Sequence, residues 1–250
     1  MERRDTQPIA AIGAVKATAT HELVAEHIRR AIFLGRFLPG DKLPPERDLA
    51  AQLAVSRTTL RVAIRVLEGE SILEVKRGAT GGLVVLGWSG LSAAEAAAYV
   101  GAQRVLIDNI FEYRLANECA ATALAAERRS EDDLTHLASV LDEMTAMCAT
   151  PESRSTLANV ARFLACDTDF HLAIARASGN PFLARAVEEA RASLLKPIGR
   201  VFARLESFVN DWHPEIFDAV RKSDPVAAAA YMKRHIEDTR DAMLAILPRS

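Results

Sequence analysis

The sequence has few of the residues that mark secreted, fibrous or membrane-embedded proteins. Its 250 residues include three cysteines (Cys119, Cys148 and Cys166), which form no close-spaced pair and cannot all be paired with one another. The 12 glycines and 10 prolines are too few for a collagen-like or low-complexity chain. No apolar run approaches the roughly 18 residues that a membrane span needs, and residues 1–20 lack the apolar core of a signal peptide. We therefore expect a reduced, cytoplasmic protein that has no membrane partner.

Aliphatic and charged residues, by contrast, are plentiful. Apolar residues form 50% of the chain and charged residues 26%, which is typical of a globular protein with ample material for a core. Residues 1–88 carry a net positive charge, whereas residues 89–250 carry a net negative one. A basic front and an acidic rear suggest two domains with different tasks.

Residues 19–87 have the element order of a winged helix-turn-helix domain. Apolar residues at helical spacing begin near Thr20, Pro44-Pro45 suits the start of a short second helix, and Ser56 suits the cap of a third. Two β-branched segments then flank a glycine-rich turn, as in a hairpin. We expect a flexible tail over 1–18, helices over 20–35, from 44 to about 53 and over 56–68, strands over 72–76 and 83–86, and a linker over 87–90.

The third of these helices has an apolar face and a basic face. The apolar stripe consists of Leu60, Ala63, Ile64 and Leu67. The opposite face carries Thr58, Arg61, Val62 and Arg65, with Arg57 at its margin. Such a helix can enter a major groove, where arginine forks to guanine and threonine contacts phosphate or the thymine methyl group.

Further basic residues flank this helix. Arg47, in the preceding helix, is placed to hold the DNA backbone, and Arg77 and Gly78 at the hairpin tip are placed to reach a minor groove or a phosphate. The alternative is a solvated basic face on an ordinary helix. The helix-turn-helix spacing favours contact with double-stranded DNA.

The same region contains a specific motif. It consists of the run GRFLPGDKLPPERDLAAQLAVSRTTLRVAIRVLEGE, followed by KRGATGGLVV. Over about residues 20–86 the chain closely resembles the N-terminal domain of bacterial transcriptional regulators of the GntR family. Ser71 departs from the family's pattern, which usually has a glycine after the recognition helix, and this leaves the geometry of the turn open. The resemblance implies contact with operator DNA by Arg47, Ser56, Arg57, Thr58, Thr59 and Arg61, with Arg77 and Gly78 at the wing tip.

Beyond residue 90 the chain is rich in alanine and has helical periodicity, with almost no strand signal. Six or seven helices are expected to form a bundle over residues 88–250, and residues 92–100 are either a separate helix or part of the next one. The predicted fold is therefore mainly α, a winged helix-turn-helix followed by an all-α bundle. Helix caps and breaks are expected near Ser130, Pro151, Gly179-Asn180-Pro181, Pro197, Asp211 and Asp224-Pro225.

Four polar side chains lie on apolar faces of these C-terminal helices. Asp167 and His171, four residues apart, share a face with aromatic residues, and His213 and His235 lie on apolar faces of two later helices. An unpaired carboxylate or imidazole is costly in a core, so the four together favour a shared divalent cation. A single inward histidine, taken alone, is more often a satisfied core residue than a metal ligand. The ligand types suit Zn²⁺, Ni²⁺ or Mn²⁺, and the sequence does not rank these ions.

This half of the chain also contains recognisable motifs. They are DTDFHLAIARASGNP, then WHPEIFDAV and AAAYMKRHI, and together they resemble the FCD ligand domain of FadR-type GntR regulators over about residues 91–247. The resemblance implies metal ligation by Asp167, His171, His213 and His235.

The earlier segment FEYRLANECAATALAA is similar to the first long helix of that domain. There, Arg114 would hold an effector carboxylate through its bidentate fork. The alternative for Arg114 is a surface or interface salt bridge, for instance with Glu118 four residues on. Asn180 is expected to cap a helix, with a contact to the effector as its second predicted role.

These features together predict a transcriptional regulator. The leading hypothesis is a homodimer that represses from a near-palindromic operator and responds to a small organic acid bound at the metal site. Regulators of this type that sense acyl-CoA do not build this metal site, so a small acid is favoured. The alternatives are a regulator for which the ion itself is the signal and a metal-dependent hydrolase. No catalytic residues are predicted, because the sequence offers no convincing general base and no phosphate-binding glycine loop.

Overall fold

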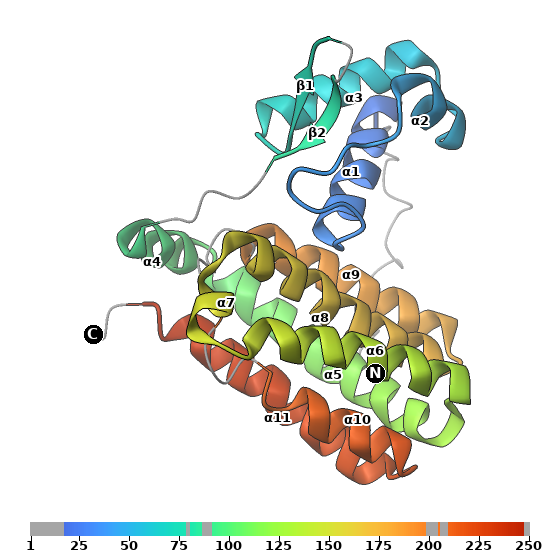
Figure 1. Ribbon diagram of the computed structural model, residues 1–250, viewed down its shortest axis with the longest axis vertical. Coiled ribbons are helices and arrows are strands. Elements are labelled where there is room, and N and C mark those ends of the chain that lie inside the picture. Colours follow the sequence, from blue (N-terminus) through green and yellow to red (C-terminus); the bar gives the residue numbers. More distant parts are fainter. Residues whose placement is uncertain (1–17, 79–80, 87–91, 199–204, 206–209, 248–250) are drawn as a thin grey trace, which may run out of the picture.

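A computed structural model describes residues 18–78, 81–86, 92–198, 205 and 210–247. It has two parts, which are stacked in Figure 1. We call residues 18–86 the head and residues 92–247 the bundle. Most of the expected tail, the turn at 79–80 and the expected linker lie outside the described residues.

The head is a winged helix-turn-helix, as the sequence predicted. Helices α1 (Thr20–Phe33), α2 (Glu46–Gln52) and α3 (Arg57–Gly69) precede an antiparallel hairpin. The hairpin strands β1 (Leu73–Lys76) and β2 (Gly82–Val85) pair from Leu73 opposite Val85 to Lys76 opposite Gly82. Pro45 is the N-cap of α2 and not a residue of its first turn, so that helix begins two residues later than expected.

The apolar stripe of α3 holds the head together. Leu60, Ala63, Ile64 and Leu67 are all buried, and they pack with residues of α1 and of the hairpin. The opposite face of α3 is left in solvent. Burial of this one stripe therefore sets which side chains of α3 are available to DNA.

The structure shows the geometry of the turn after α3, which the sequence had left open because Ser71 stands where the family usually has glycine. Ser71 has a φ of +56°, in the left-handed region. Its amide donates to the carbonyl of Glu68 (2.9 Å), and the amide of Ile72 donates to the carbonyl of Leu67 (3.0 Å). This is the usual hydrogen-bonded closure of a helix C-terminus, in which glycine is preferred because it tolerates a positive φ. Serine thus occupies the turn without altering its form.

The bundle contains, in its described residues, seven helices of nine or more residues and one short helix. Residues 93–102 form a helix separate from the long helix that follows. The described part of helix α9 runs to Ile198 and includes Pro197, near which a break was expected, and residues 199–204 lie outside the described residues. The elements are α4 (Ala93–Ala102), α5 (Arg104–Arg128), α6 (Glu131–Cys148), α7 (Pro151–Ser155), α8 (Leu157–Ala177), α9 (Pro181–Ile198), α10 (His213–Arg221) and α11 (Pro225–Leu244).

Helix α5 runs through the centre of the bundle and packs against α8, α9, α10 and α11. Its Phe111 meets an apolar core that includes Phe163 and Phe170 of α8 and Ile216 of α10, all essentially without solvent exposure. This arrangement turns the inner faces of α5, α8, α10 and α11 towards one another. None of the described helices combines the length and apolar character needed to cross a membrane.

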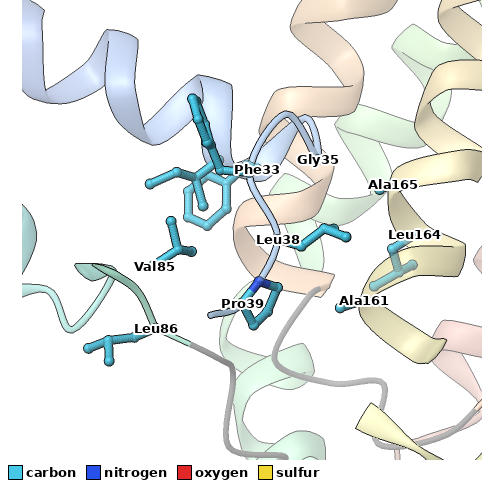
Figure 2. A pocket seen from close by; sticks show the side chains of 11 residues that line it. Phe33, Gly35, Leu38, Pro39, Val85, Leu86, Ala161, Leu164 and Ala165 are labelled. Carbon is cyan, nitrogen blue, oxygen red and sulfur yellow. The ribbon is translucent and has the colours of Figure 1, made fainter. Parts of the chain in front are cut away.

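The head rests on α8 and α9 of the bundle. Gly35 follows α1 with a φ of +75°, and a Cβ placed on it would lie 2.5 Å from the Cβ of Ala165. Leu38 and Pro39 of the head lie near Ala161 on α8, around the small pocket drawn in Figure 2.

Charged residues flank this apolar contact between head and bundle. Arg30 Nε and Arg36 Nη2 lie 3.4 Å and 3.6 Å from Glu188 Oε1 on α9. The head therefore contacts the same two helices, α8 and α9, that also reach the interior of the bundle.

Candidate functional site

The four predicted metal ligands meet inside the bundle. Asp167 and His171 come from α8, His213 is the first residue of α10, and His235 lies on α11. All four are buried, and one ligand atom from each lies within 4.8 Å of the others. The i, i+4 spacing on α8 places Asp167 and His171 on the same face, as the sequence predicted.

The distances within this cluster suit a single ion. His171 Nε2 lies 3.2 Å from His235 Nε2 and 3.5 Å from Asp167 Oδ1. His213 Nε2 lies 3.0 Å from Asp167 Oδ1. Bonds of about 2.0–2.2 Å to Zn²⁺ would place neighbouring ligand atoms about 3.0–3.5 Å apart. Three neutral imidazoles and one carboxylate are also a donor set that such ions accept, so the residues present fit a divalent metal.

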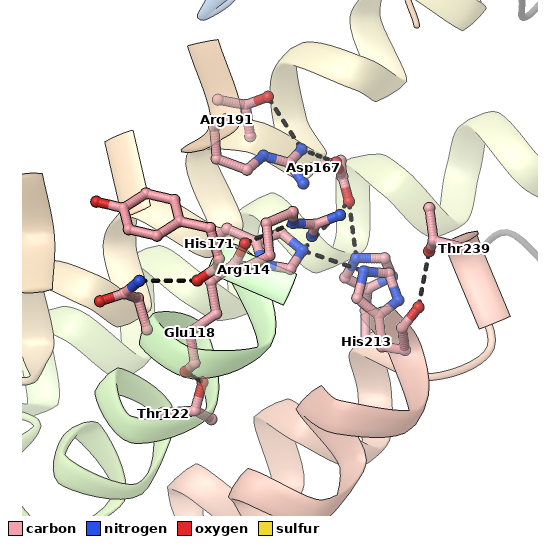
Figure 3. Close-up of polar contacts among 12 residues, drawn as sticks. Arg114, Glu118, Thr122, Asp167, His171, Arg191, His213 and Thr239 are labelled. Carbon is pink, nitrogen blue, oxygen red and sulfur yellow. Dashed lines mark hydrogen bonds and ion pairs between the residues drawn. The ribbon is translucent and has the colours of Figure 1, made fainter. Parts of the chain in front are cut away.

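A buried arginine balances the charge of Asp167. The guanidinium group of Arg191, on α9, donates through Nη2 to Asp167 Oδ2, and the same nitrogen lies 3.2 Å from Thr168 Oγ1. The side chains of Arg191 and Asp167 are 3% and 12% exposed, so the pair is largely shielded from water. Asp167 therefore offers Oδ1 to the histidines while Oδ2 is held by Arg191 (Figure 3).

A second ion pair lies beside the first, on α5. Arg114 Nε donates to Glu118 Oε1 (2.6 Å), and His171 Nδ1 lies 2.5 Å from Glu118 Oε2. Arg114 is completely buried, so the surface salt bridge considered from the sequence is wrong in its placement, although Glu118 is the correct partner. Nη1 and Nη2 of Arg114 have no hydrogen-bond partner among the described residues.

The ionisation of the two carboxyl groups follows from these contacts. Burial by itself would raise the pKa of Asp167, but Arg191 and the bonds with His171 and His213 outweigh it and hold that pKa well below 3.8. Burial opposes ionisation of Glu118 as well, yet Arg114 and His171 hold its pKa well below 4.5. Both carboxyl groups are therefore anionic at neutral pH.

The histidines respond in the opposite way to the same burial. Burial lowers the pKa of His213 despite its bond to Asp167. Burial and the neighbouring His213 and His171 lower the pKa of His235 well below 6.5. Both side chains are neutral at pH 7, which is the form in which histidine binds metal ions.

We expect the metal-free protein to lose stability as the pH falls below about 6.5. In the folded state the pKa values of His213 and His235 lie below the ordinary value of 6.5, so the unfolded chain binds more protons in that range. Their contribution is complete above pH 6.5 and is lost as the pH falls through the folded-state values, by at most about 1.4 kcal/mol per pH unit for each histidine.

Urea unfolding in the presence of a chelator, at steps from pH 7.5 to 5, measures this loss. His235→Gln removes one of the two groups and should show a shallower decline than wild type. Equal slopes for the two proteins would contradict the expectation.

Most of the predicted DNA-binding residues of the head are exposed. Arg57, Thr58, Arg61 and Arg65 project from α3 with exposed side chains, and Arg47, Arg77 and Gly78 are exposed as well. Ser56 and Thr59 also fix the start of α3, because Ser56 Oγ accepts from the amide of Thr59 (3.0 Å) and lies 2.8 Å from Thr59 Oγ1. Arg61 Nε is paired with Glu46 Oε2 on α2 (2.8 Å).

Two family matches cover these two parts of the chain. Residues 20–81 match the gntR family of bacterial regulatory proteins, and residues 109–238, more than half of the chain, match the FCD domain. The chain belongs to the GntR family of transcriptional regulators and carries an FCD domain. This confirms the family and the fold class that the sequence motifs predicted.

Relatives of this GntR-family chain match along most of their length. The Exu regulon transcriptional regulator of Escherichia coli (strain K12) is 30% identical over 230 residues, which cover 88% of this chain and 83% of the relative. The Uxu operon transcriptional regulator of the same strain is 29% identical over 243 residues, which cover 92% and 89%. Both relatives are transcriptional regulators, which confirms the prediction that this chain is a regulator and not an enzyme.

A solved structure supports the fold of this FCD-containing regulator. E. coli McbR/YncC aligns with a TM-score of 0.53 over 91% of this chain and 99% of that chain, at 18% sequence identity. At that identity the likeness speaks for the fold alone. The roles of the individual site residues rest on the geometry described above.

Two effector contacts were predicted for the FCD domain, and the structure places them differently. Arg114 lies beside the His/Asp cluster. Asn180 caps α9, where its Oδ1 accepts from the amides of Phe182 (3.0 Å) and Leu183 (3.4 Å). The cap was expected, whereas a contact between Asn180 and an effector stays a prediction.

Two residues of the site were missed or misjudged in the sequence. Arg191 was not singled out, although it shares a buried face of α9 with Val187 and Leu194, at i−4 and i+3. An arginine on an apolar stripe is a signal of a buried partner. Glu118 was considered only as a partner for Arg114, and its contact with His171 had no signal in the sequence.

Proposed function

We propose that this GntR-family protein is a homodimeric repressor whose affinity for operator DNA is lowered by a small carboxylic acid bound at a divalent metal in the FCD domain. The observation that carries the proposal is a buried, fully assembled Asp/His₃ cluster next to Arg114, whose two terminal nitrogens have no partner among the described residues. Buried guanidinium nitrogens without partners are costly, and a carboxylate would satisfy both.

The metal would be held by Asp167, His171, His213 and His235. A divalent ion held there supplies open coordination positions for oxygen atoms of the acid. Arg114 would bind the carboxylate through Nη1 and Nη2 while Glu118 holds its Nε. Zn²⁺, Ni²⁺ and Mn²⁺ all suit this donor set.

The DNA interface would be the exposed face of α3 together with the hairpin. Arg57, Arg61 and Arg65 would contact base edges and phosphates in the major groove, with Arg47 and Arg77 on the DNA backbone. Two heads in a dimer would require two half-sites related by two-fold symmetry. A regulator of this kind meets its operator in the cytoplasm.

Binding of the acid would lower the affinity for operator DNA through the contact between head and bundle. Asp167 lies two residues after Ala165 on α8, and Arg191 lies three residues after Glu188 on α9. The candidate site and the surface that contacts the head therefore share helices α8 and α9. By linkage, DNA must weaken binding of the acid by the same factor.

A thermal-shift screen of the metal-loaded protein against small carboxylates tests the effector site. An acid present at about 100 times its Kd stabilises the folded state by about 2.7 kcal/mol, which corresponds to a rise in Tm of about 5–10 °C for a chain of this size. Arg114→Lys keeps a cation beside Glu118 but removes the fork, so we expect the shift to be lost. Asn180→Asp preserves the helix cap and tests the second predicted contact.

Other outcomes of the same screen are informative. If no metal can be loaded and no acid shifts the melt, the proposed site is wrong. DNA affinity, measured separately, distinguishes the remaining alternative. If the metal alone changes that affinity and no acid adds to the effect, the ion is the signal.

Selection of DNA from a random pool by the purified protein tests the other half of the proposal. We expect an inverted repeat, because a dimer reads two related half-sites. Arg57→Ala should weaken binding to the selected DNA by about 1–3 kcal/mol, as for loss of one arginine–guanine contact. Arg221→Ala, at the exposed end of α10, is the control and should bind as wild type does. Equal affinity of the two variants would exclude Arg57 from the interface.

A further inference from the structure

Glu118 touches both halves of the proposed ligand site. Its Oε2 lies 2.5 Å from Nδ1 of the metal ligand His171, and its Oε1 accepts from Nε of the effector-binding Arg114 (2.6 Å). All three side chains are buried. No other described carboxylate contacts either His171 Nδ1 or Arg114.

We infer that Glu118 is a positioning residue that prepares His171 for the metal and Arg114 for the carboxylate at the same time. The inference rests on the proposed function of the cluster, but it concerns a residue outside the set of four ligands. Glu118 would act through its contacts with these two neighbours and would not touch the ion.

The contact with His171 determines which ring nitrogen carries the proton. A carboxylate can only accept, so the approach of Glu118 Oε2 to 2.5 Å calls for a proton on His171 Nδ1. Nε2 is then the ring nitrogen left for a metal ion, and it lies 3.2 Å from His235 Nε2. A carboxylate behind the ligating histidine is a common device for fixing the tautomer and raising the basicity of the ligand.

The contact with Arg114 fixes the direction of its fork. Because Glu118 holds Nε, the two remaining nitrogens are left as a pair without partners among the described residues. The carboxylate of Glu118 also balances the charge of Arg114, so the arginine can stay buried before any acid binds. One side chain therefore prepares both subsites for their ligands.

Replacement by glutamine provides a sharp test, because it preserves size but not hydrogen-bond character. Glutamine has one acceptor oxygen and one amide donor, whereas both neighbours of Glu118 are donors. Arg114 is always charged and takes the oxygen, so the amide of Glu118→Gln faces His171 Nδ1. The Nδ1 proton of His171 then has no acceptor, and a ring that carries its proton on Nε2 cannot ligate the ion through that nitrogen.

Zn²⁺ binding, measured by competition with a chromophoric chelator, gives the first readout. We expect Glu118→Gln to bind Zn²⁺ about 10–100-fold more weakly than wild type. Thr122→Val is the matched control on the same helix, because Thr122 Oγ1 donates only to the backbone oxygen of Glu118 (2.7 Å). It should retain wild-type affinity. Glu118→Asp keeps the charge with a shorter reach and should lie between wild type and Glu118→Gln.

The ¹⁵N chemical shifts of His171 in the metal-free proteins give a second readout that needs no metal. We expect Nδ1 to carry a proton in wild type and to lack it in Glu118→Gln. The inference is overturned if wild type binds Zn²⁺ and both Glu118 variants bind it equally well, or if the tautomer is the same in wild type and Glu118→Gln. Failure of wild type itself to bind Zn²⁺ would overturn the proposed metal site instead.

Discussion

Replacing Arg191 with methionine should destabilise the metal-free protein by about 3–5 kcal/mol, the range found when one partner of a buried ion pair is removed. Methionine matches the arginine stem in length and leaves no large cavity, so the loss comes from charge. Asp167 would be left buried with its Oδ2 unpaired, because Arg191 is its cationic partner among the described residues. Urea unfolding in the presence of EDTA measures the change.

Arg185→Met is the matched control on the same helix. Arg185 is exposed and lies over the ring of Phe182, with 4.9 Å between its guanidinium carbon and the ring centroid. We expect a change within about 0.5 kcal/mol, as for most surface substitutions. If Arg191→Met unfolds at the same urea concentration as this control, Asp167 does not depend on Arg191.

Added Zn²⁺ should recover much of the stability that Arg191→Met loses. A divalent ion on Asp167 Oδ1 compensates the same carboxylate, and an ion that binds only the folded state raises the unfolding free energy by mass action. The gain on adding Zn²⁺ should therefore be at least as large in Arg191→Met as in wild type. A variant that stays equally unstable with and without Zn²⁺ would count against a metal at Asp167.

Gly35→Ala should detach the head from the bundle while leaving both folded. The new Cβ would lie 2.5 Å from the Cβ and 2.7 Å from the Cα of Ala165, and the backbone of α8 cannot move aside without disturbing Asp167 two residues on. Each part has its own apolar core, so the head can separate without unfolding. We expect a larger radius of gyration in X-ray scattering and a separate melting transition for the head.

Gly40→Ala is a close control for this substitution. Gly40 has a φ of +91° but no heavy atom within 4 Å of the new Cβ. Both variants place an L-residue in the left-handed region, which lowers the free energy of unfolding by about 1 kcal/mol in each. Only Gly35→Ala adds the clash with Ala165, so the difference between the two isolates the contact between head and bundle. The same scattering profile for both would show that Ala165 does not hold the head.

The same pair of variants addresses how the site controls DNA. If the head is switched through α8 and α9, Gly35→Ala should bind metal, acid and DNA, yet its DNA affinity should no longer depend on the acid. Gly40→Ala should respond as wild type does. Loss of coupling with binding retained is the expected signature of a broken connection between two intact sites.

The head was predictable because its information is local. Ser56 caps α3, apolar residues recur at helical spacing along α3, and glycines mark the hairpin turn. Each element is therefore determined by a short stretch of sequence. The positive φ of Ser71 was not predictable from the residue type, because serine rarely adopts it. It follows from the position of the turn after α3, which the surrounding fold imposes.

The candidate metal cluster was predictable for a different reason. Asp167, His171, His213 and His235 each lie on an apolar helical face, and an apolar face must turn inwards. The sequence therefore showed that all four enter the core, and the resemblance to the FCD domain grouped them as one ligand set. It could not show that their ligand atoms come within 4.8 Å, because that depends on how α8, α10 and α11 pack.

The sequence by itself determined the two-part, mainly α architecture, the exposed arginine face of α3 and the inward direction of the four metal-binding candidates, since helical periodicity decides which side of a helix is buried. Only the tertiary structure decided the partners of the buried charges. Arg191 reaches Asp167 from α9, and Glu118 of α5 contacts His171 of α8. Such pairings join residues on separate helices, and the packing of those helices, not their periodicity, brings two particular side chains within bonding distance.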